Sequence, residues 1–558
     1  MVPRGAALIA VMLAATACAP SPPPPAIAPA RGGTAVIAWQ EPATLHPFYS
    51  TATQTNALVY EVAVEGLVRT DPGGSLVPVL AIAVPTLANG DVTLLPEGRM
   101  AVRYVLRPNV TWSDGAPLTS ADIRFTWQSV VRDPLVASRE GYDLIEGVDT
   151  PDERTAVVRY REPYPAYATR FDALLPRHAL EGVDPSKTDY PRRPLGTGPF
   201  VISEFVSGDH ITADRNPRYR DAARPYLDHL VFRFVSSVEA AKAQLRAGEV
   251  HVAASLSEAD VAELEQEKAI AIESGPSPSV ETLGFRLATP GTSIEASAPH
   301  PVLGDLAVRR ALLLATPKTS IVERLLGGRA RPGTTEIPLG WAAPQGLAQE
   351  SYDPAKAARV LDDAGWLKGS DGVRVGAGVR AKLTIVSTTG NRLREQIEQV
   401  LVDEWRAIGV DLAIRNVPSA ILTGSWQSGG VRKRGDFDVL LAQAGLAFGA
   451  TDPQSYLSQR RRCASIPRAD NGGAGANYER FCDPRADRLL DEAGRTLDDT
   501  RRRALYVQLL ALVDSAVPNV YLFDRGRFDA HRIDVGGLRA NGWDVLTWNV
   551  AEWYRASR

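Results

Sequence analysis

The chain has 558 residues, which is too long for one ordinary domain and predicts two or three compact lobes. Apolar residues make up 44% and charged residues 23%, as in soluble globular proteins. The 62 basic and 65 acidic residues give a net charge of −3 without a long basic cluster, so composition gives no support to nucleic-acid binding.

The N-terminus has the pattern of an export signal. Arg4 precedes an apolar run, 6–17, that is too short to span a bilayer, so residues 1–17 are predicted to be a signal peptide. The small residues 15–17 before Cys18 resemble a lipobox, which predicts lipidation of Cys18. The alternative is an ordinary signal peptide cut near the same small residues.

A proline-rich stretch follows the predicted lipidation site. Residues 18–31 contain the run APSPPPPAIAPA, whose prolines favour an extended conformation. We expect this stretch to be a stiff tether outside the fold. Because no later run is long and apolar enough to span a bilayer, the mature protein is expected to be anchored to the membrane by its lipid.

The first elements alternate between strand and helix patterns. Residues 34–39 read as a strand, 40–56 as a polar connection, and 57–68 as an apolar stretch. Alternating residues 102–107 then predict a half-buried strand, and 109–115 a turn. Thr119 is a predicted helix N-cap, with Asp122 three positions later.

Strand and helix signals continue along the chain, which predicts a mixed α/β fold. Further strands are expected at 156–160, 201–205, 230–235, 283–287, 383–387, 410–414 and 439–441. Ser237 and Asp353 are expected to cap helices, and glycines at 248 and 365 to end them. The two cysteines of the mature chain, Cys463 and Cys482, are predicted to form a disulfide, with two buried thiols as the alternative.

Catalytic patterns are missing from the sequence. The seven histidines form no HExxH pattern, and there is neither a GxSxG elbow nor a GxxxxGK loop. We therefore expect no enzyme activity, no cofactor and no metal site. Capture of a metal complex by histidines gathered in space remains an alternative.

The segment SDGAPLTSADIRFTW, 113–127, resembles the signature of the family-5 extracytoplasmic solute-binding proteins, which serve peptide- and nickel-type ABC importers. The resemblance extends to the blocks 69–81, 196–235, 306–326, 352–366, 383–414 and 502–523. It implies the α/β class II (cluster C) fold of periplasmic binding proteins, with two lobes, an additional subdomain and a central ligand cleft.

The implied boundaries follow the chain. Lobe one is expected to comprise 32–75, 195–285 and 520–558, its subdomain 76–194, and lobe two 286–519. The signature then lies in the subdomain, where Asp114, Gly115 and Thr119 are expected to be scaffold. Gly196 and Gly198 lie at the predicted return to lobe one, where their backbone freedom suits a crossover or hinge.

By the same resemblance, the connection after the first strand and the loop after DFDVLLAQAG are expected to line the cleft. The candidate ligand-binding residues are Glu41, Thr53, Gln54, Asn56 and Tyr60 from lobe one, and Trp426, Phe448, Thr451 and Asp452 from lobe two. The alternative for each is loop capping or packing.

One departure bears on the ligand. Peptide-binding members carry a tryptophan and then an aspartate before an Asp-Pro step, and that aspartate pairs with the peptide ammonium. Here Ala444 is near the tryptophan position and Gly449 or Ala450 near the aspartate position. Because a buried ammonium needs an anionic partner, this weakens the expectation of a peptide.

The resemblance implies a monomeric, lipid-anchored receptor at the outer face of the bacterial cytoplasmic membrane or in the periplasm. It would deliver a peptide-like or other polar solute to a permease that works with ATPase subunits. A non-peptide ligand such as an oligosaccharide, an opine or a metal chelate is the first alternative. A surface sensor or chaperone without a permease is the second.

Overall fold

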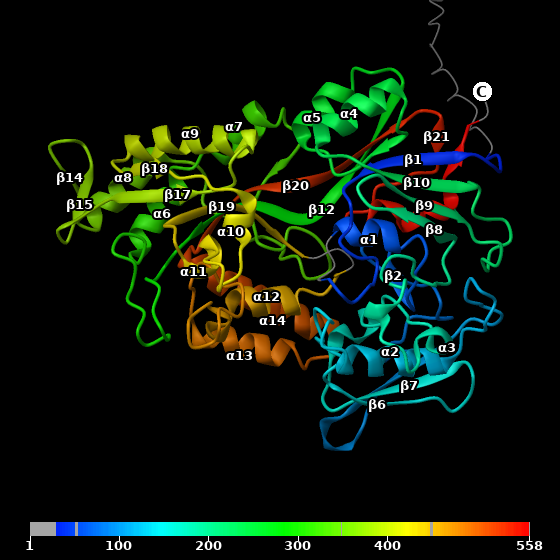
Figure 1. The fold of residues 1–558 in the computed structure, drawn as a ribbon. Helices are drawn as coiled ribbons and strands as arrows, with labels where there is room; N and C mark the ends of the chain where they lie inside the picture. The colour runs from blue at the N-terminus through cyan, green and yellow to red at the C-terminus, as the bar shows by residue number, and fades with distance from the viewer. Residues whose placement is uncertain (1–28, 51–53, 348, 447–449, 557–558) are drawn as a thin grey trace, which may run out of the picture.

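The computed structural model describes residues 29–50, 54–347, 349–446 and 450–556 (Figure 1). The predicted signal peptide, Cys18, most of the tether, Thr53 and Phe448 lie outside these ranges. Within them, no helix combines the length and apolarity needed to cross a membrane.

A mixed sheet of eleven strands runs through the molecule, in the order β18-β17-β19-β12-β20-β11-β1-β10-β9-β8, with β13 beside β20. Its strands are β1 (Thr34–Trp39), β8 (Phe200–Val206), β9 (His210–Arg215), β10 (His229–Phe234), β11 (Val252–Ala253), β12 (Ile270–Phe285), β13 (Arg331–Pro332), β17 (Lys382–Val386), β18 (Asp411–Ile414), β19 (Val439–Gly445) and β20 (Asn519–Arg532). The strands predicted from residue patterns are present, with shifted ends.

Two long antiparallel strands, β12 and β20, join the two halves of the sheet (Figure 1). Their pairing runs from Ile270 to Pro276, shifts register, and resumes at Val280. The shift lies about midway along β12, so the ladder is interrupted between the two halves. The two connections between the halves therefore share an irregular segment where the strands can bend.

A four-stranded antiparallel sheet lies beside the large one, in the order β4-β5-β7-β6. Its strands are β4 (Val92–Leu94), β5 (Met100–Val105), β6 (Ile145–Asp149) and β7 (Thr155–Tyr160). The helices of this part are α2 (Ser120–Arg132) and α3 (Arg177–Leu180). The predicted capping box is confirmed, because Asp122 accepts a hydrogen bond from the backbone N–H of Thr119 at 2.8 Å. Asp114 accepts from Ala116 N and pairs with His178, so the signature serves as scaffold in this part.

The remaining helices cover the large sheet or form a layer below it (Figure 1). They are α1 (Gln54–Tyr60), α4 (Val238–Ala247), α5 (Glu258–Leu264), α6 (Leu306–Leu314), α7 (Lys318–Leu325), α8 (Pro354–Asp363), α9 (Arg392–Ala407), α10 (Ser419–Thr423), α11 (Val431–Arg434), α12 (Gln454–Arg461), α13 (Pro484–Ala493) and α14 (Asp499–Ala516). As predicted, Ser237 caps α4 and Asp353 caps α8. Gly248 and Gly365 follow the ends of these helices with φ of 77° and 81°.

Short elements complete the chain. They are the strands β2 (Val68–Thr70), β3 (Leu76–Pro78), β14 (Leu367–Lys368), β15 (Arg374–Gly376), β16 (Val379–Arg380), β21 (Val535–Gly536) and β22 (Tyr554–Arg555), and the 3₁₀ turns η1 (Pro96–Gly98), η2 (Pro165–Thr169), η3 (Pro185–Lys187), η4 (Cys463–Ser465) and η5 (Leu546–Glu552).

Separate hydrophobic cores hold the parts together. One core joins residues of β1, β8–β10 and the C-terminal segment, and we call the part around it the first lobe. A second lies between the small sheet and α2, and defines the subdomain. Two more, under α6–α9 and among α12–α14, define the second lobe. These cores follow the predicted division of the chain, whose boundaries remain a prediction.

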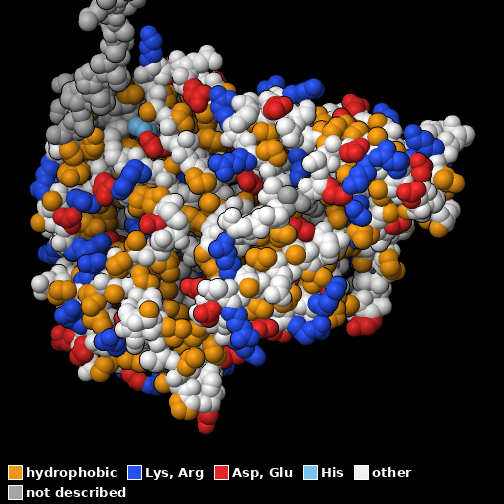
Figure 2. Space-filling model, turned by 180° about the vertical axis from the view of Figure 1, so that it is seen from behind, with side chains coloured by type: hydrophobic (Ala, Val, Ile, Leu, Met, Phe, Trp, Pro, Cys, Tyr) orange, Lys and Arg blue, Asp and Glu red, His pale blue; other side chains and the backbone are white. Residues whose placement is uncertain are grey.

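The predicted disulfide is confirmed, since Cys463 and Cys482 are bonded. It joins η4 to the start of α13, within the second lobe. On the face seen in Figure 2, basic and acidic side chains are interspersed.

Candidate functional site: a cavity between the lobes

A cavity of about 760 Å³ lies where the two lobes and the subdomain meet. The first lobe contributes residues of α1 and β2, and the subdomain contributes the segments 138–142 and 169–172. The second lobe contributes residues of β19, α11 and α12. Its volume is in the range of pockets that enclose small ligands.

The wall from the first lobe carries two carboxylates that share one arginine. Arg69 Nε lies 3.3 Å from Asp544 Oδ2, and Arg69 Nη2 lies 3.4 Å from Glu61 Oε2. Burial raises the pKa of Glu61 well above its usual range, and the neighbouring Asp544 carboxylate raises it further. Deeper in the wall, Glu65 binds Arg220 and accepts from Thr197 Oγ1 at 3.0 Å. These acids all have partners in the protein.

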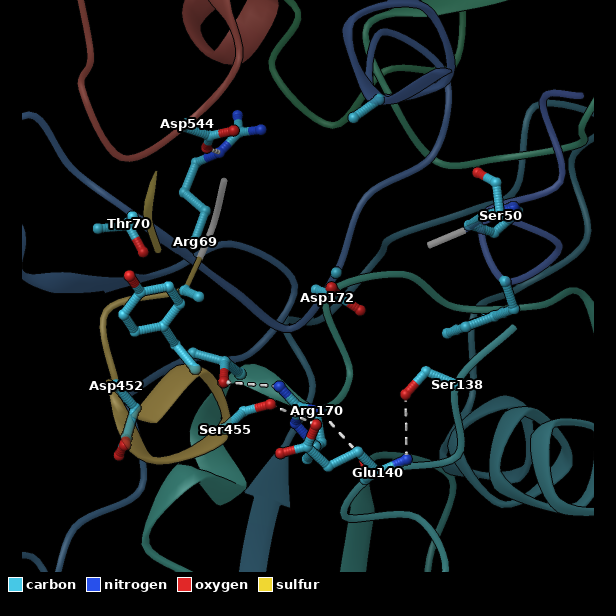
Figure 3. Close-up of a pocket in the computed structure, with 18 of the residues that line it drawn as sticks. Ser50, Arg69, Thr70, Ser138, Glu140, Arg170, Asp172, Asp452, Ser455 and Asp544 are labelled. Atoms are coloured by element: carbon cyan, nitrogen blue, oxygen red, sulfur yellow. Dashed lines mark hydrogen bonds and ion pairs between the residues drawn. The ribbon is translucent and has the colours of Figure 1, made fainter. Parts of the chain in front are cut away.

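Asp172 is different, because its side chain is exposed while its neighbours Phe171 and Ala173 are buried. It lines the cavity, and no dashed line reaches its carboxylate in Figure 3. Water inside the cavity can reach it, yet protein surrounds it. This enclosure raises the pKa of Asp172 to about 6, opposed by the positive charge of Arg170 and aided by Asp544.

The subdomain contacts the second lobe beside the cavity. Ser455 Oγ donates to Glu140 Oε2 at 2.6 Å, and Arg170 Nη1 donates to the Glu140 carbonyl at 3.1 Å (Figure 3). Farther out, Arg495 pairs with Glu162 at 3.3 Å. The cavity is thus bridged on this side by direct contacts between the two parts.

The wall from the second lobe is basic. Burial alone would lower the pKa of Arg460, but Glu479, whose Oε1 lies 2.6 Å from Arg460 Nη2, raises it. Glu336 and Glu479 also bind Arg461, which is fully buried. Arg432 stacks over Tyr478 at 5.2 Å and forms no ion pair with any described residue. Its burial lowers its pKa.

Both segments that were expected to line the cavity do so, but only some of the predicted side chains line it. Tyr60 and Asp452 line it. Asp452, however, is bound on both carboxylate oxygens by Arg502, so its charge is already compensated. Binding of a ligand by these two residues stays a prediction.

Five other predicted residues are engaged elsewhere. Glu41 accepts from Ser207 and Gly208, Gln54 donates to Ser255, Asn56 donates to Ser50, Trp426 stacks under Arg434, and the Thr451 carbonyl accepts from Trp341. These contacts match the capping and packing alternative. Their role in binding remains untested.

Asp172 and Arg432 line the cavity without having been predicted. Asp172 has a sequence signal, since it is a single charge in the apolar run FDALL. Arg432 lies in the basic run VRKR, where nothing in the sequence distinguishes it from its neighbours. Ala444, near the position where peptide-binding relatives are expected to have a tryptophan, lines the cavity, and so does Ala450.

The glycines expected at the crossover serve close packing instead. A Cβ at Gly196 would lie 1.9 Å from the Ala63 carbonyl oxygen, and one at Gly198 2.7 Å from the same atom. Neither has a positive φ. Among the residues that the structure describes, no group of three or more His, Cys, Asp or Glu side chains could hold a metal ion.

A two-lobed α/β fold around an enclosed polar cavity is that of a solute-binding protein. The chain belongs to the bacterial extracellular solute-binding proteins of family 5, because the family model described as "Bacterial extracellular solute-binding proteins, family 5 Middle" matches residues 84–468. This confirms the family predicted from the segment 113–127.

Individual proteins of similar sequence and structure agree with this family assignment. Protein XP55 of Streptomyces lividans is 25% identical over 91% of this chain and 84% of its own length. The oligopeptide-binding protein AppA of Bacillus subtilis is 24% identical over 95% of this chain and 92% of its own. The structure of AppA with a nonapeptide has a TM-score of 0.73, covering 95% of this chain and all of that one at 23% identity. NikZ of Campylobacter jejuni, in complex with Ni(L-His), has a TM-score of 0.76 at 23% identity, covering 94% and 99%. These structures confirm the predicted fold class.

Proposed function

We propose that this protein is the substrate-binding component of an ABC importer and captures a peptide-like or other polar solute in the cavity between its lobes. The observation that carries the proposal is the cavity of about 760 Å³ lined by both lobes and the subdomain. A ligand that contacts every part stabilises the arrangement in which they are together. The protein itself catalyses no covalent step.

Closure and release need a movable connection between the lobes. The two long strands β12 and β20 shift register between Pro276 and Val280, and Ser279 within this segment lines the cavity. Bending there opens the cavity with little disruption of either core. The direct contact of Ser455 with Glu140 then breaks on opening and forms on closure.

Export and lipid anchoring belong to the proposal. The extracellular family, the N-terminal pattern before Cys18 and the Cys463–Cys482 disulfide support an oxidising, extracytoplasmic location. A monomer anchored by Cys18 would pass its solute to the permease and its ATPase subunits. Labelling of cells with a fatty-acid analogue tests the anchor, because Cys18→Ala should remove the label from the protein.

The experiment that tests solute capture is native mass spectrometry of protein purified without refolding. Compounds released from it are then added back, and the melting temperature is measured. Retention of a small solute that raises the melting temperature supports the proposal. Co-purification of membrane permease subunits supports import, whereas a soluble partner in their place supports a sensor or chaperone.

A non-peptide solute is the second candidate. The replacement of the expected aspartate by Gly449 or Ala450 favours it, because a peptide ammonium would then lack its usual partner in the second lobe. A released opine, oligosaccharide or metal chelate in the mass spectrum would decide for this candidate.

A further inference from the structure

Two charged side chains that line the cavity from different parts of the protein form no ion pair with a described residue. They are Asp172, near the junction of the first lobe and subdomain, and Arg432 in the second lobe. The Asp172 carboxylate accepts a hydrogen bond from the backbone N–H of Ala173 and lies near the Arg170 guanidinium without pairing with it, and the Arg432 side chain forms no hydrogen bond with another described residue. An enclosed charge without a partner is costly, and a ligand of opposite charge removes that cost.

Asp172 is held in place by its backbone. Leu67 N donates to the Phe171 carbonyl at 2.8 Å, and Leu174 N donates to the Glu65 carbonyl at 3.3 Å. A Cβ at Gly66 would lie 2.4 Å from the Asp172 carbonyl, so the two segments are in direct contact. A rigid backbone therefore presents this carboxylate to the cavity, and binding a ligand orders little else.

A second polar group points to a ligand on the same side. Tyr60 is only 7% exposed and lines the cavity. Its hydroxyl has no hydrogen-bond partner among the residues that the structure describes. Burial raises the pKa of Tyr60 well above 10, and the nearby Glu61 and Asp172 carboxylates raise it further, so the hydroxyl stays protonated and can donate or accept a hydrogen bond.

Most other charged groups that face the cavity have an ion pair, while Glu140 accepts only from Ser455 Oγ through its side chain. Arg69 serves both Glu61 and Asp544, and Arg502 serves Asp452. Arg460 has Glu479 in the same way. Arg170 donates instead to the Glu140 carbonyl and the Thr169 hydroxyl, so it lies near Asp172 without pairing with it.

Arg432 is the corresponding group of the second lobe. One face of its guanidinium lies over Tyr478 at 5.2 Å, and its Nε is buried without a hydrogen-bond partner in the described chain. Its planar fork of donors suits a carboxylate. The nearby arginines Arg394 and Arg460 are both held by glutamates, so Arg432 is the cation left for a ligand on this wall.

We propose that the ligand is a zwitterion, with its ammonium group bound by Asp172 and its carboxylate bound by Arg432. This rests on the proposed function. A peptide so bound has its amino terminus against the first lobe and subdomain, where Asp172 replaces the aspartate that the second lobe lacks. The lack of an acidic residue near Ala450 then determines the orientation in which the ligand binds. It does not exclude a peptide.

The test uses three pools of dipeptides to pentapeptides: free, N-acetylated and C-amidated. Melting temperatures and dissociation constants are measured for the mature protein, Asp172→Asn and Arg432→Gln. The controls are Asp143→Asn, an exposed aspartate of the subdomain, and Arg434→Gln, in the same short helix as Arg432 but outside the cavity lining.

We expect N-acetylation to weaken binding to the parent about tenfold or more, as loss of a charge-assisted hydrogen bond does. C-amidation should have a similar effect. Asp172→Asn should bind free and N-acetylated peptides equally and still reject the amides, and Arg432→Gln should do the converse. Both controls should behave like the parent. Asp172→Glu and Arg432→Lys serve the same test if a neutral variant fails to fold.

Equal binding of the free and N-acetylated pools by the parent overturns the zwitterion proposal, and so does discrimination retained by Asp172→Asn. If no pool binds, the solute identified by native mass spectrometry decides. An uncharged solute refutes the zwitterion and leaves solute capture standing, whereas a non-peptide zwitterion supports both. If no solute is retained and no pool binds, both proposals fail.

Discussion

Replacing Asp452 tests whether this residue stabilises the fold or binds the ligand. Its Oδ1 accepts from Arg502 Nη2 at 2.7 Å and from the backbone N–H of Gln454 at 2.9 Å, and its Oδ2 is bound by Arg502 Nη1. The Arg502 side chain is 2% exposed. Asp452→Ala leaves that guanidinium buried without its anion, which costs about 3–5 kcal/mol.

That cost can be read in a urea titration followed by tryptophan fluorescence. With an m-value of about 3 kcal/mol/M for a lobe of this size, the midpoint should fall by about 1–2 M. Because the cost arises from the stranded cation, Arg502→Met in the Asp452→Ala background should restore at least half of the loss. Asp452→Asn, which keeps the shape of the side chain, should lie between the parent and Asp452→Ala.

Ligand affinity at low temperature is the second measurement. If Asp452 acts through Arg502, the folded Asp452→Ala protein should bind the ligand within about threefold of the parent, under about 1 kcal/mol. A midpoint unchanged within about 0.2 M, together with a tenfold loss of affinity, would refute this reasoning. In that case Asp452 binds the ligand directly, as the sequence predicts.

Three further changes test other parts of the structure. The folded pKa of Asp172, about 6, exceeds the unfolded value of about 3.9, so the stability of the ligand-free protein should fall as pH rises from 4 to 6. Asp172→Asn should therefore raise the ligand-free melting temperature at pH 7.5 and not at pH 4; an equal change at both values would contradict this. Replacing Cys463 and Cys482 by alanine opens a link across 19 positions and should cost about 3 kcal/mol relative to the oxidised parent, whereas the reduced parent should match the double variant. Gly196→Ala forces a Cβ into the Ala63 carbonyl and should cost about 3 kcal/mol in a urea titration, whereas a gain in stability would favour backbone freedom as the reason for glycine there.

The sequence is most informative where local chemistry decides the structure. Ser237 and Asp353 cap the predicted helices because a side-chain oxygen near the first free N–H groups is favourable in almost any surroundings. The length of β12 could not be predicted. Its segment GPSP, 275–278, has the composition of a turn, and it is part of the strand because β20 pairs with the residues on both sides.

The candidate site is predictable at the level of segments only. The chain after β1 and the chain after β19 both reach the cavity, as the family resemblance implies. Which side chains point inward depends on turns and packing that the sequence does not specify, so Glu41 and Trp426 are engaged elsewhere. Asp172 comes from the subdomain, which the sequence assigns to scaffold, and only the folded chain brings it into the same cavity as Arg432.

The proposed conflict between stability and binding at Asp172 would make this residue a better guide to function than the fully paired acids. Glu61, Asp544 and Arg69 satisfy one another, so their geometry is accounted for by folding alone. An enclosed carboxylate that is exposed to the cavity gives the folded protein nothing until a cation arrives. A protein that keeps such a group on a rigid backbone loses stability when empty and recovers it when occupied, and this difference drives closure around the ligand. A variant that is more stable when empty and no longer responds to the solute therefore reports a binding residue, whereas a variant that is merely less stable reports scaffold.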